Sequence, residues 1–464
     1  MSGDLLYMSA AEAGRKIAAK ELSSAELTEA LLARTEAIDG KLNAYIRLLG
    51  DMARSMAKDA DAAIAGSDAK GPLHGVPVAL KDIIDLAGVH TTAHSKLLLD
   101  NVAKSDAFVT AKLKAAGCVI TGKLATHEFA IGGPAFDLPF PPARNPWNPE
   151  HHPGGSSSGA GTSVAAGMVP AALGSDPGGS VRNPASCCGI VGIKPTYGRV
   201  SRMGVVPLSF SLDNVGPLTR TVEDNALMLG AIAGFDPNDP ASDPRPVPDY
   251  TADLKRGGKG LKIGLIRHFY NEDLIADEEM AASIEATAKL LEGMGAEVRE
   301  IRLPPLSQYA ACNRVILLSE AYAIHQKDLQ TRPGDYSATT RRRLLPGAFM
   351  SGADYVNATR MREKLVAAFN EAMEGLDAAV TASSMEPPVN MSDMQEVERT
   401  YARQARAPFN LIGNPAIAIP TGLHSNGLPL ALQIVGRAFD EAMCFRVAWA
   451  VEQELNVGVQ RPPV

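Results

Sequence analysis

Apolar positions recur along the chain in two periods, one typical of strands and one typical of helices. In Gly75-Val-Pro-Val-Ala-Leu-Lys81 they alternate, which predicts a strand with Val76, Val78 and Leu80 on one face and Lys81 on the other. Capping-box patterns at Ser9 and Ser23 precede runs in which apolar residues recur at helical spacing. We expect helices over 9–38 (two), 107–117, 161–173, 221–234, 277–294, 312–330, 353–374 and 440–455, and further strands over 118–121, 261–266, 298–303, 416–420 and 430–435.

This order of elements indicates an α/β fold with a mixed sheet. The strand–helix–strand succession over 261–303 predicts a parallel strand pair. The Pro- and Asp-rich stretch 236–260 is the best candidate for a linker. We therefore expect an N-terminal part over 1–235 and a C-terminal part over 261–464 that completes the sheet and shapes a substrate pocket.

Composition narrows the class of protein. The net charge of −7, from 45 basic and 52 acidic residues, gives no support to a nucleic-acid binder. The five cysteines have no zinc-site spacing, so we expect small, buried, unpaired residues in a reducing compartment. No signal peptide or membrane-spanning run is evident. We expect a cytoplasmic protein that does not bind a membrane.

Glycine and serine are concentrated at 153–161 and 174–184, and four interpretations compete there. The first is a phosphate-binding loop, but the GK[ST] motif that completes such a loop does not follow here. A nucleophile elbow matches GxSxG at Gly155–Gly159 by letter, but the Pro-rich stretch upstream excludes the required strand. Structural turns are the usual role of such residues. The fourth interpretation is acyl transfer, in which Ser180 attacks a carbonyl and nearby backbone N–H groups hold the oxyanion.

A serine nucleophile needs a base. None of the nine histidines lies in a recognisable triad context. Lys81 ends an apolar strand, and a desolvated lysine can act as a base, although most strand-end lysines extend to water. On its own, Lys81 is a weak candidate.

The combination is more specific than its parts. Lys81-Asp is followed by Gly-Gly-Ser156-Ser157, and Asp176-x-Gly-Gly-Ser180-x-Arg182 places Ser180 24 residues after Ser156. With these motifs and further blocks, the sequence resembles the amidase signature family over nearly the whole chain. The further blocks lie at 186–201, 211–224, 414–422 and 427–436.

The resemblance implies a Ser-Ser-Lys triad on a mixed sheet covered by helices on both faces. Lys81 matches the base, Ser156 the bridging serine on a cis peptide bond, and Ser180 the nucleophile of an acyl-enzyme. Neither a metal nor a cofactor is implied. The backbone N–H groups expected to hold the oxyanion are those of Gly178, Gly179 and Ser180.

Pro177 departs from the family pattern, since the residue there can contribute an oxyanion N–H and proline has none. Ser157, Asp176 and Arg182 could contact substrate, and the family resemblance favours a structural role for Arg182. Asp176 and Asp213 are expected to hold their loops through hydrogen bonds.

The expected function is hydrolysis of the C–N bond of a small amide, aryl amides included, by a single-chain amidohydrolase that releases ammonia or an amine. The alternatives are the A subunit of a tRNA-dependent amidotransferase, acting as a glutaminase, or a carbamate or urea hydrolase. A non-catalytic scaffold is disfavoured because Lys81, Ser156 and Ser180 are all retained. We expect a homodimer whose partner is a small-molecule amide, with no nucleic acid.

Overall fold

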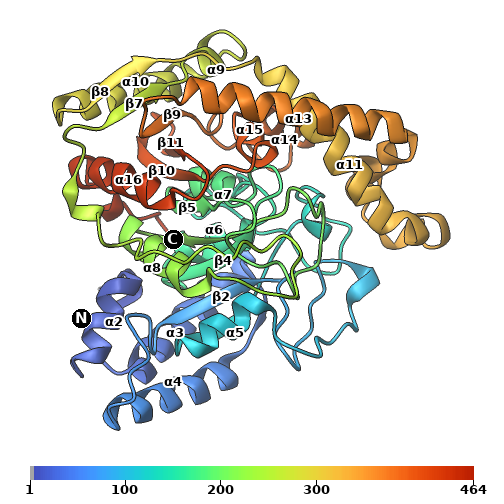
Figure 1. Cartoon of the computed structure of the whole chain (residues 1–464). Helices are drawn as coiled ribbons and strands as arrows, with labels where there is room; N and C mark the ends of the chain where they lie inside the picture. Colours follow the sequence, from blue (N-terminus) through green and yellow to red (C-terminus); the bar gives the residue numbers. More distant parts are fainter. Residues whose placement is uncertain (1–4) are drawn as a thin grey trace.

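The computed structural model describes residues 5–464, which form one 11-stranded mixed sheet with helices on both faces (Figure 1). The strand order is β1-β3-β2-β4-β6-β5-β10-β11-β9-β7-β8. The strands are β1 (Tyr45–Leu48), β2 (Pro77–Lys81), β3 (Val119–Leu124), β4 (Ala171–Ser175), β5 (Val191–Lys194), β6 (Val215–Thr219), β7 (Lys262–Leu265), β8 (Glu297–Glu300), β9 (Ala378–Ala382), β10 (Ala416–Leu423) and β11 (Pro429–Gly436).

The helices alternate with these strands along most of the chain. They are α2 (Ala10–Ala18), α3 (Ser24–Leu42), α4 (Gly50–Ala65), α5 (Phe108–Ala115), α6 (Ser158–Ala165), α7 (Arg182–Cys188), α8 (Val222–Ile232), α9 (His268–Asn271), α10 (Glu278–Gly293), α11 (Leu306–Thr331), α12 (Ala338–Leu344), α13 (Gly352–Ala372), α14 (Met394–Ala402), α15 (Ala407–Leu411) and α16 (Glu441–Leu455).

The two parts of the chain on either side of 236–260 share the sheet. Strands β1 to β6 precede this stretch and β7 to β11 follow it, and the two sets join where β5 pairs with β10 in antiparallel register. The long helices α11 and α13 extend sideways from the sheet in Figure 1. The sheet is thus continuous from the N-terminal to the C-terminal part.

Alternation along β2 divides the core into two layers, as the sequence predicts. Val78 and Leu80 pack in the larger apolar cluster, together with residues of α8 and α16. Ala79 packs on the opposite face in a smaller cluster with residues of α6 and α7. Lys81, two residues on, therefore points to the α6 face.

Helix α6 consists of small residues because it lies very close to its neighbours. A methyl group on Gly159 would lie 2.4 Å from the carbonyl oxygen of Ala44 and 2.6 Å from the backbone nitrogen of Ala125. Only glycine permits this approach. Close packing brings the N-terminal end of α6 against the ends of β2 and β4.

Most predicted elements are confirmed with small shifts in their ends. The caps at Ser9 and Ser23 form, and β7 and β8 pair in parallel. The helix expected over 161–173 is wrong, because α6 ends at Ala165 and Ala171–Ser175 is strand β4, which lies between β2 and β6 in the sheet. All five cysteines are buried and unpaired, as expected. Within residues 5–464, no helix combines the length and apolar character of a membrane span.

Two glycine substitutions test this close packing in opposite directions. A methyl group on Gly216 in β6 would lie 2.0 Å from the carbonyl oxygen of Ile193, so we expect Gly216→Ala to lower the free energy of unfolding by about 1–3 kcal/mol. Gly40 in α3 has no atom within 4 Å of that position, so Gly40→Ala should raise it by about 0.5–1 kcal/mol. Urea unfolding measures both, and equal effects would contradict the packing.

Candidate active site

Two parallel strands place the candidate residues. β2 and β4 are neighbours in the sheet, so Lys81 at the end of β2 and Ser175 at the end of β4 meet at the same edge. The segment that leads into α6 brings Ser156 and Ser157 to this edge. All four side chains are at least 96% buried.

The Lys81 amine lies among three hydroxyl groups. Lys81 Nζ donates to Ser156 Oγ at 2.6 Å, to Ser175 Oγ at 2.9 Å and to Ser157 Oγ at 3.3 Å. No ion pair joins Lys81 to a carboxylate in the described part of the chain. Burial lowers the pKa of Lys81 to about 7, and the more distant Asp213 and Asp176 only partly oppose this shift.

Ser157 has a structural role besides its contact with Lys81. Its Oγ donates to the carbonyl oxygen of Ser175 at 3.2 Å and accepts from the Ser175 N–H at 3.1 Å. These bonds tie the start of α6 to the end of β4. Ser175 is absent from the sequence-predicted site because its role arises from a tertiary contact with Lys81 on the neighbouring strand, which no local pattern shows.

Ser180 Oγ faces the segment that carries Ser156. A methyl group on Gly155 would lie 3.1 Å from Ser180 Oγ, and the Ser157 N–H donates to the carbonyl oxygen of Ser180 at 3.3 Å. The backbone of residues 5–464 contains no cis peptide bond, so the cis bond expected at Ser156 is absent. The structure therefore brings Lys81, Ser156 and Ser180 together.

Asp176 shapes the loop that carries Ser180. Its carboxylate accepts from the N–H groups of Gly179 at 2.6 Å and Val181 at 3.1 Å. Burial alone would raise the pKa of Asp176, but the adjacent Arg182 outweighs it and holds this pKa well below its usual range. Asp176 thus makes hydrogen bonds across its own loop.

This bond changes the expected oxyanion site. The Gly179 N–H is already donated to Asp176, and Pro177 has no N–H. The N–H groups of Gly178 and Ser180 have no acceptor among the described residues. These two N–H groups can therefore donate to an oxyanion without the loss of an existing hydrogen bond.

Arg182 is completely buried and serves as a structural link. Nε and Nη2 donate to the two oxygens of Asp176, both at 3.1 Å. Its guanidinium also donates to residues of the C-terminal part that sequence reasoning missed. These acceptors are Asn410 Oδ1, Gln433 Oε1 and the carbonyl oxygen of Arg406.

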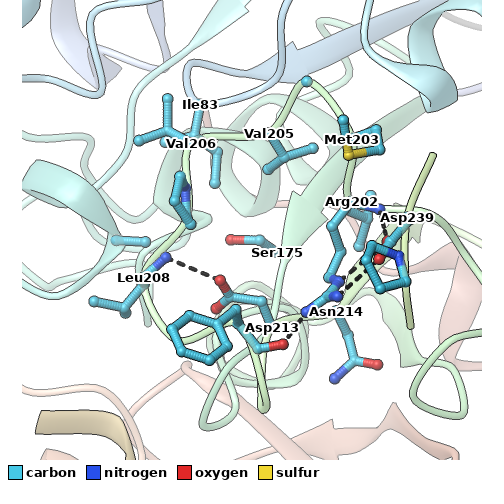
Figure 2. Close-up of a pocket in the computed structure, with 16 residues that line it drawn as sticks. Ile83, Ser175, Arg202, Met203, Val205, Val206, Leu208, Asp213, Asn214 and Asp239 are labelled. Atoms are coloured by element: carbon cyan, nitrogen blue, oxygen red, sulfur yellow. Dashed lines mark hydrogen bonds and ion pairs between the residues drawn. The ribbon is translucent and has the colours of Figure 1, made fainter. Parts of the chain in front are cut away.

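A cavity of about 330 Å³ opens beside Ser175. Figure 2 shows Ser175 between Ile83 and Asp213, with the ion pair of Arg202 and Asp239 at one side. Asp213 Oδ2 accepts from the N–H groups of Leu208 and Ser209, as the sequence predicts, and burial raises its pKa to about 6. Most of the remaining wall is apolar.

Comparison with known proteins places this site in a family. The model of the amidase family matches residues 26–445. The A subunit of glutamyl-tRNA(Gln) amidotransferase from Geobacter metallireducens is 42% identical over 94% of each chain. The peptide amidase of Stenotrophomonas maltophilia is 31% identical over 98% of each chain, with a TM-score of 0.86. A chain from a vestigial complex related to an s-triazine catabolic enzyme is 32% identical over 98% of this chain and all of that one, with a TM-score of 0.91.

The amidotransferase relatives correct one expectation. Their name describes one component of an enzyme that acts on glutamyl-tRNA, so the expectation of a small-molecule partner alone and no nucleic acid is contradicted. The fold and the enzyme class expected from the sequence are confirmed. The chain belongs to the amidase family and is an enzyme that hydrolyses carbon–nitrogen bonds.

Proposed function

We propose that this enzyme hydrolyses a carboxamide through an acyl-enzyme on Ser180, with Lys81 as the base. The observation that carries the proposal is the 2.6 Å contact between the buried Lys81 amine and Ser156 Oγ. A lysine with a pKa near 7 is partly neutral at neutral pH and can accept a proton. On the other side, a methyl group on Gly155, the residue before Ser156, would lie 3.1 Å from Ser180 Oγ.

The reaction follows from these contacts. The proton of Ser180 passes to Ser156 Oγ as the proton of Ser156 passes to Lys81 Nζ, and Ser180 Oγ attacks the carbonyl carbon. The N–H groups of Gly178 and Ser180 hold the oxyanion. When the C–N bond breaks, the proton returns through Ser156 to the leaving nitrogen. Water then attacks the acyl-enzyme by the same relay, which releases a carboxylic acid and restores Ser180.

The relatives support a specific substrate and a role as one subunit of a larger enzyme. We propose the side-chain carboxamide of glutamine as the substrate and the A subunit of a tRNA-dependent amidotransferase as the role, because the amidotransferase relatives cover nearly the full chain. A second candidate is a small apolar or aryl amide. The observation that favours it is the largely apolar wall of the cavity beside Ser175.

The nucleophile is tested by covalent labelling. A fluorophosphonate should add to one serine of the wild type, and Ser180→Ala should lose both this adduct and about 10⁴-fold in kcat. Ser163→Ala is the matched control, because Ser163 carries a buried hydroxyl on α6 whose one hydrogen bond to the described residues goes to the carbonyl oxygen of Ala160. Intact-mass spectrometry reads the adduct. The same adduct on Ser180→Ala would place the nucleophile elsewhere.

The base is tested by the pH dependence of acylation. Because the active form of Lys81 is neutral and its pKa is about 7, the rate should rise with pH through about 7 and then level off. Lys81→Arg, which stays protonated, should lose at least about 10²-fold at every pH. Stopped-flow acylation rates measure this, and an unchanged pH profile in Lys81→Arg would exclude Lys81 as the base.

The proposed substrate and the proposed subunit role are tested by measuring ammonia release. The chain should hydrolyse glutamine slowly alone and faster when the other subunits of a bacterial amidotransferase and glutamyl-tRNA are added. Benzamide and butyramide serve as comparison substrates. Rapid hydrolysis of these amides, with no response of glutamine hydrolysis to the added components, would favour the second candidate and reject the first.

A further inference from the structure

Arg406 is a buried cation without an anionic partner. Its side chain is 2% exposed, and it forms no ion pair in the described part of the chain. Nη1 donates to the carbonyl oxygen of Ser383 at 2.8 Å and to Ser384 Oγ. Nε has no acceptor, and no hydrogen bond from Nη2 is present among the described residues. One edge of the guanidinium, Nε with Nη2, is therefore unpaired.

The neighbouring Arg182 shows what such an edge binds. There the same two nitrogens, Nε and Nη2, donate to the two oxygens of the Asp176 carboxylate. This paired geometry is the strong, bidentate form of carboxylate binding by arginine. Arg406 presents the same edge with no carboxylate, and a buried charge without a partner is unfavourable.

The unpaired edge lies beside the proposed nucleophile. A methyl group on Gly179, the residue before Ser180, would lie 2.6 Å from Arg406 Nε. An anion bound at this edge would thus be adjacent to the loop on which the oxyanion forms. The position fits a part of the substrate that does not react.

Two further buried donors near this loop also lack a partner within residues 5–464. His152 Nδ1 accepts from the Gly154 N–H, so Nε2 carries the proton of the neutral ring, and it has no partner. Asn313 Nδ2 has no partner either, but the atom of this amide that lies nearest the loop is the acceptor Oδ1, 4.0 Å from a methyl group placed on Gly178. The unpaired edge of Arg406 and the unpaired Nε2 of His152 are both hydrogen-bond donors, which an anion can accept.

We propose that Arg406 binds a carboxylate of the substrate, which makes the substrate class amides that carry a carboxylate. The proposal rests on the acyl transfer at Ser180 proposed above. It includes glutamine, but it also extends to the half-amides of dicarboxylic acids, and it disfavours neutral aryl amides. Arg406 acts in recognition and takes no proton during the reaction.

Paired substrates that differ only in charge test the proposal. Succinamate and glutaramate carry a carboxylate, whereas 4-oxopentanamide and 5-oxohexanamide place a neutral methyl ketone in its position. The wild type should prefer the carboxylates by about 100-fold in kcat/KM. Arg406→Met should lose about 100-fold on the carboxylates, mostly in KM, and less than about threefold on the ketones. Arg406→Lys keeps the charge but loses the paired N–H donors of the guanidinium, so its kcat/KM on the carboxylates should fall between those of the wild type and Arg406→Met.

Controls separate recognition from structure. Arg399→Met removes an exposed arginine of α14 that pairs with Glu396 and Glu386, and it should leave the preference unchanged. Binding of succinate to Ser180→Ala, measured by calorimetry, should disappear when Arg406→Met is added. Equal losses on both substrate classes, or a wild type without charge preference, would overturn the proposal. Failure of Ser180 to label with a fluorophosphonate would instead reject the acyl transfer on which it rests.

Discussion

The site depends on the removal of one amine from water. Lys81 is fully buried at the end of β2, and three serine hydroxyls, not a carboxylate, surround its amine. Hydroxyls can solvate either form of the amine, whereas a carboxylate would stabilise the charged form and raise the pKa. This environment accounts for a pKa near 7 and thus for a lysine that can act as a base. The proposed relay would fail if Lys81 remained charged at neutral pH.

A second buried group keeps the loop around this amine in place. Asp176 binds the N–H groups that follow it, and Arg182 links Asp176 to side chains of the C-terminal part. Removing one partner of such a buried pair typically costs about 3–5 kcal/mol, so the pair holds the loop strongly. The C-terminal part thereby supports the loop of Ser180 through Arg182. It also supplies Arg406, which connects loop structure to the proposed recognition of substrate.

The sequence predicts the elements whose signals are local. The caps of α2 and α3, the two faces of β2 and the parallel pair β7–β8 follow from short patterns. It does not predict β4, since a strand of five small or apolar residues that follows a helix of small residues has no distinct period. Ser175, Asn410 and Gln433 were missed for a different reason. Their roles arise from tertiary contacts between distant segments, and the engagement of Gly179 by Asp176 likewise becomes visible only when the loop is folded.

The central claim is that burial makes the Lys81 amine neutral near neutral pH. Carbon-13 labelling of lysine side chains at Cε, with the Lys81 resonance assigned by its loss in Lys81→Arg, follows this single group by NMR. Ser180→Ala provides a background in which no acyl-enzyme forms. We expect the Lys81 resonance to titrate with a pKa of about 7. A midpoint near 10.4, the value of a solvated lysine, would contradict the account.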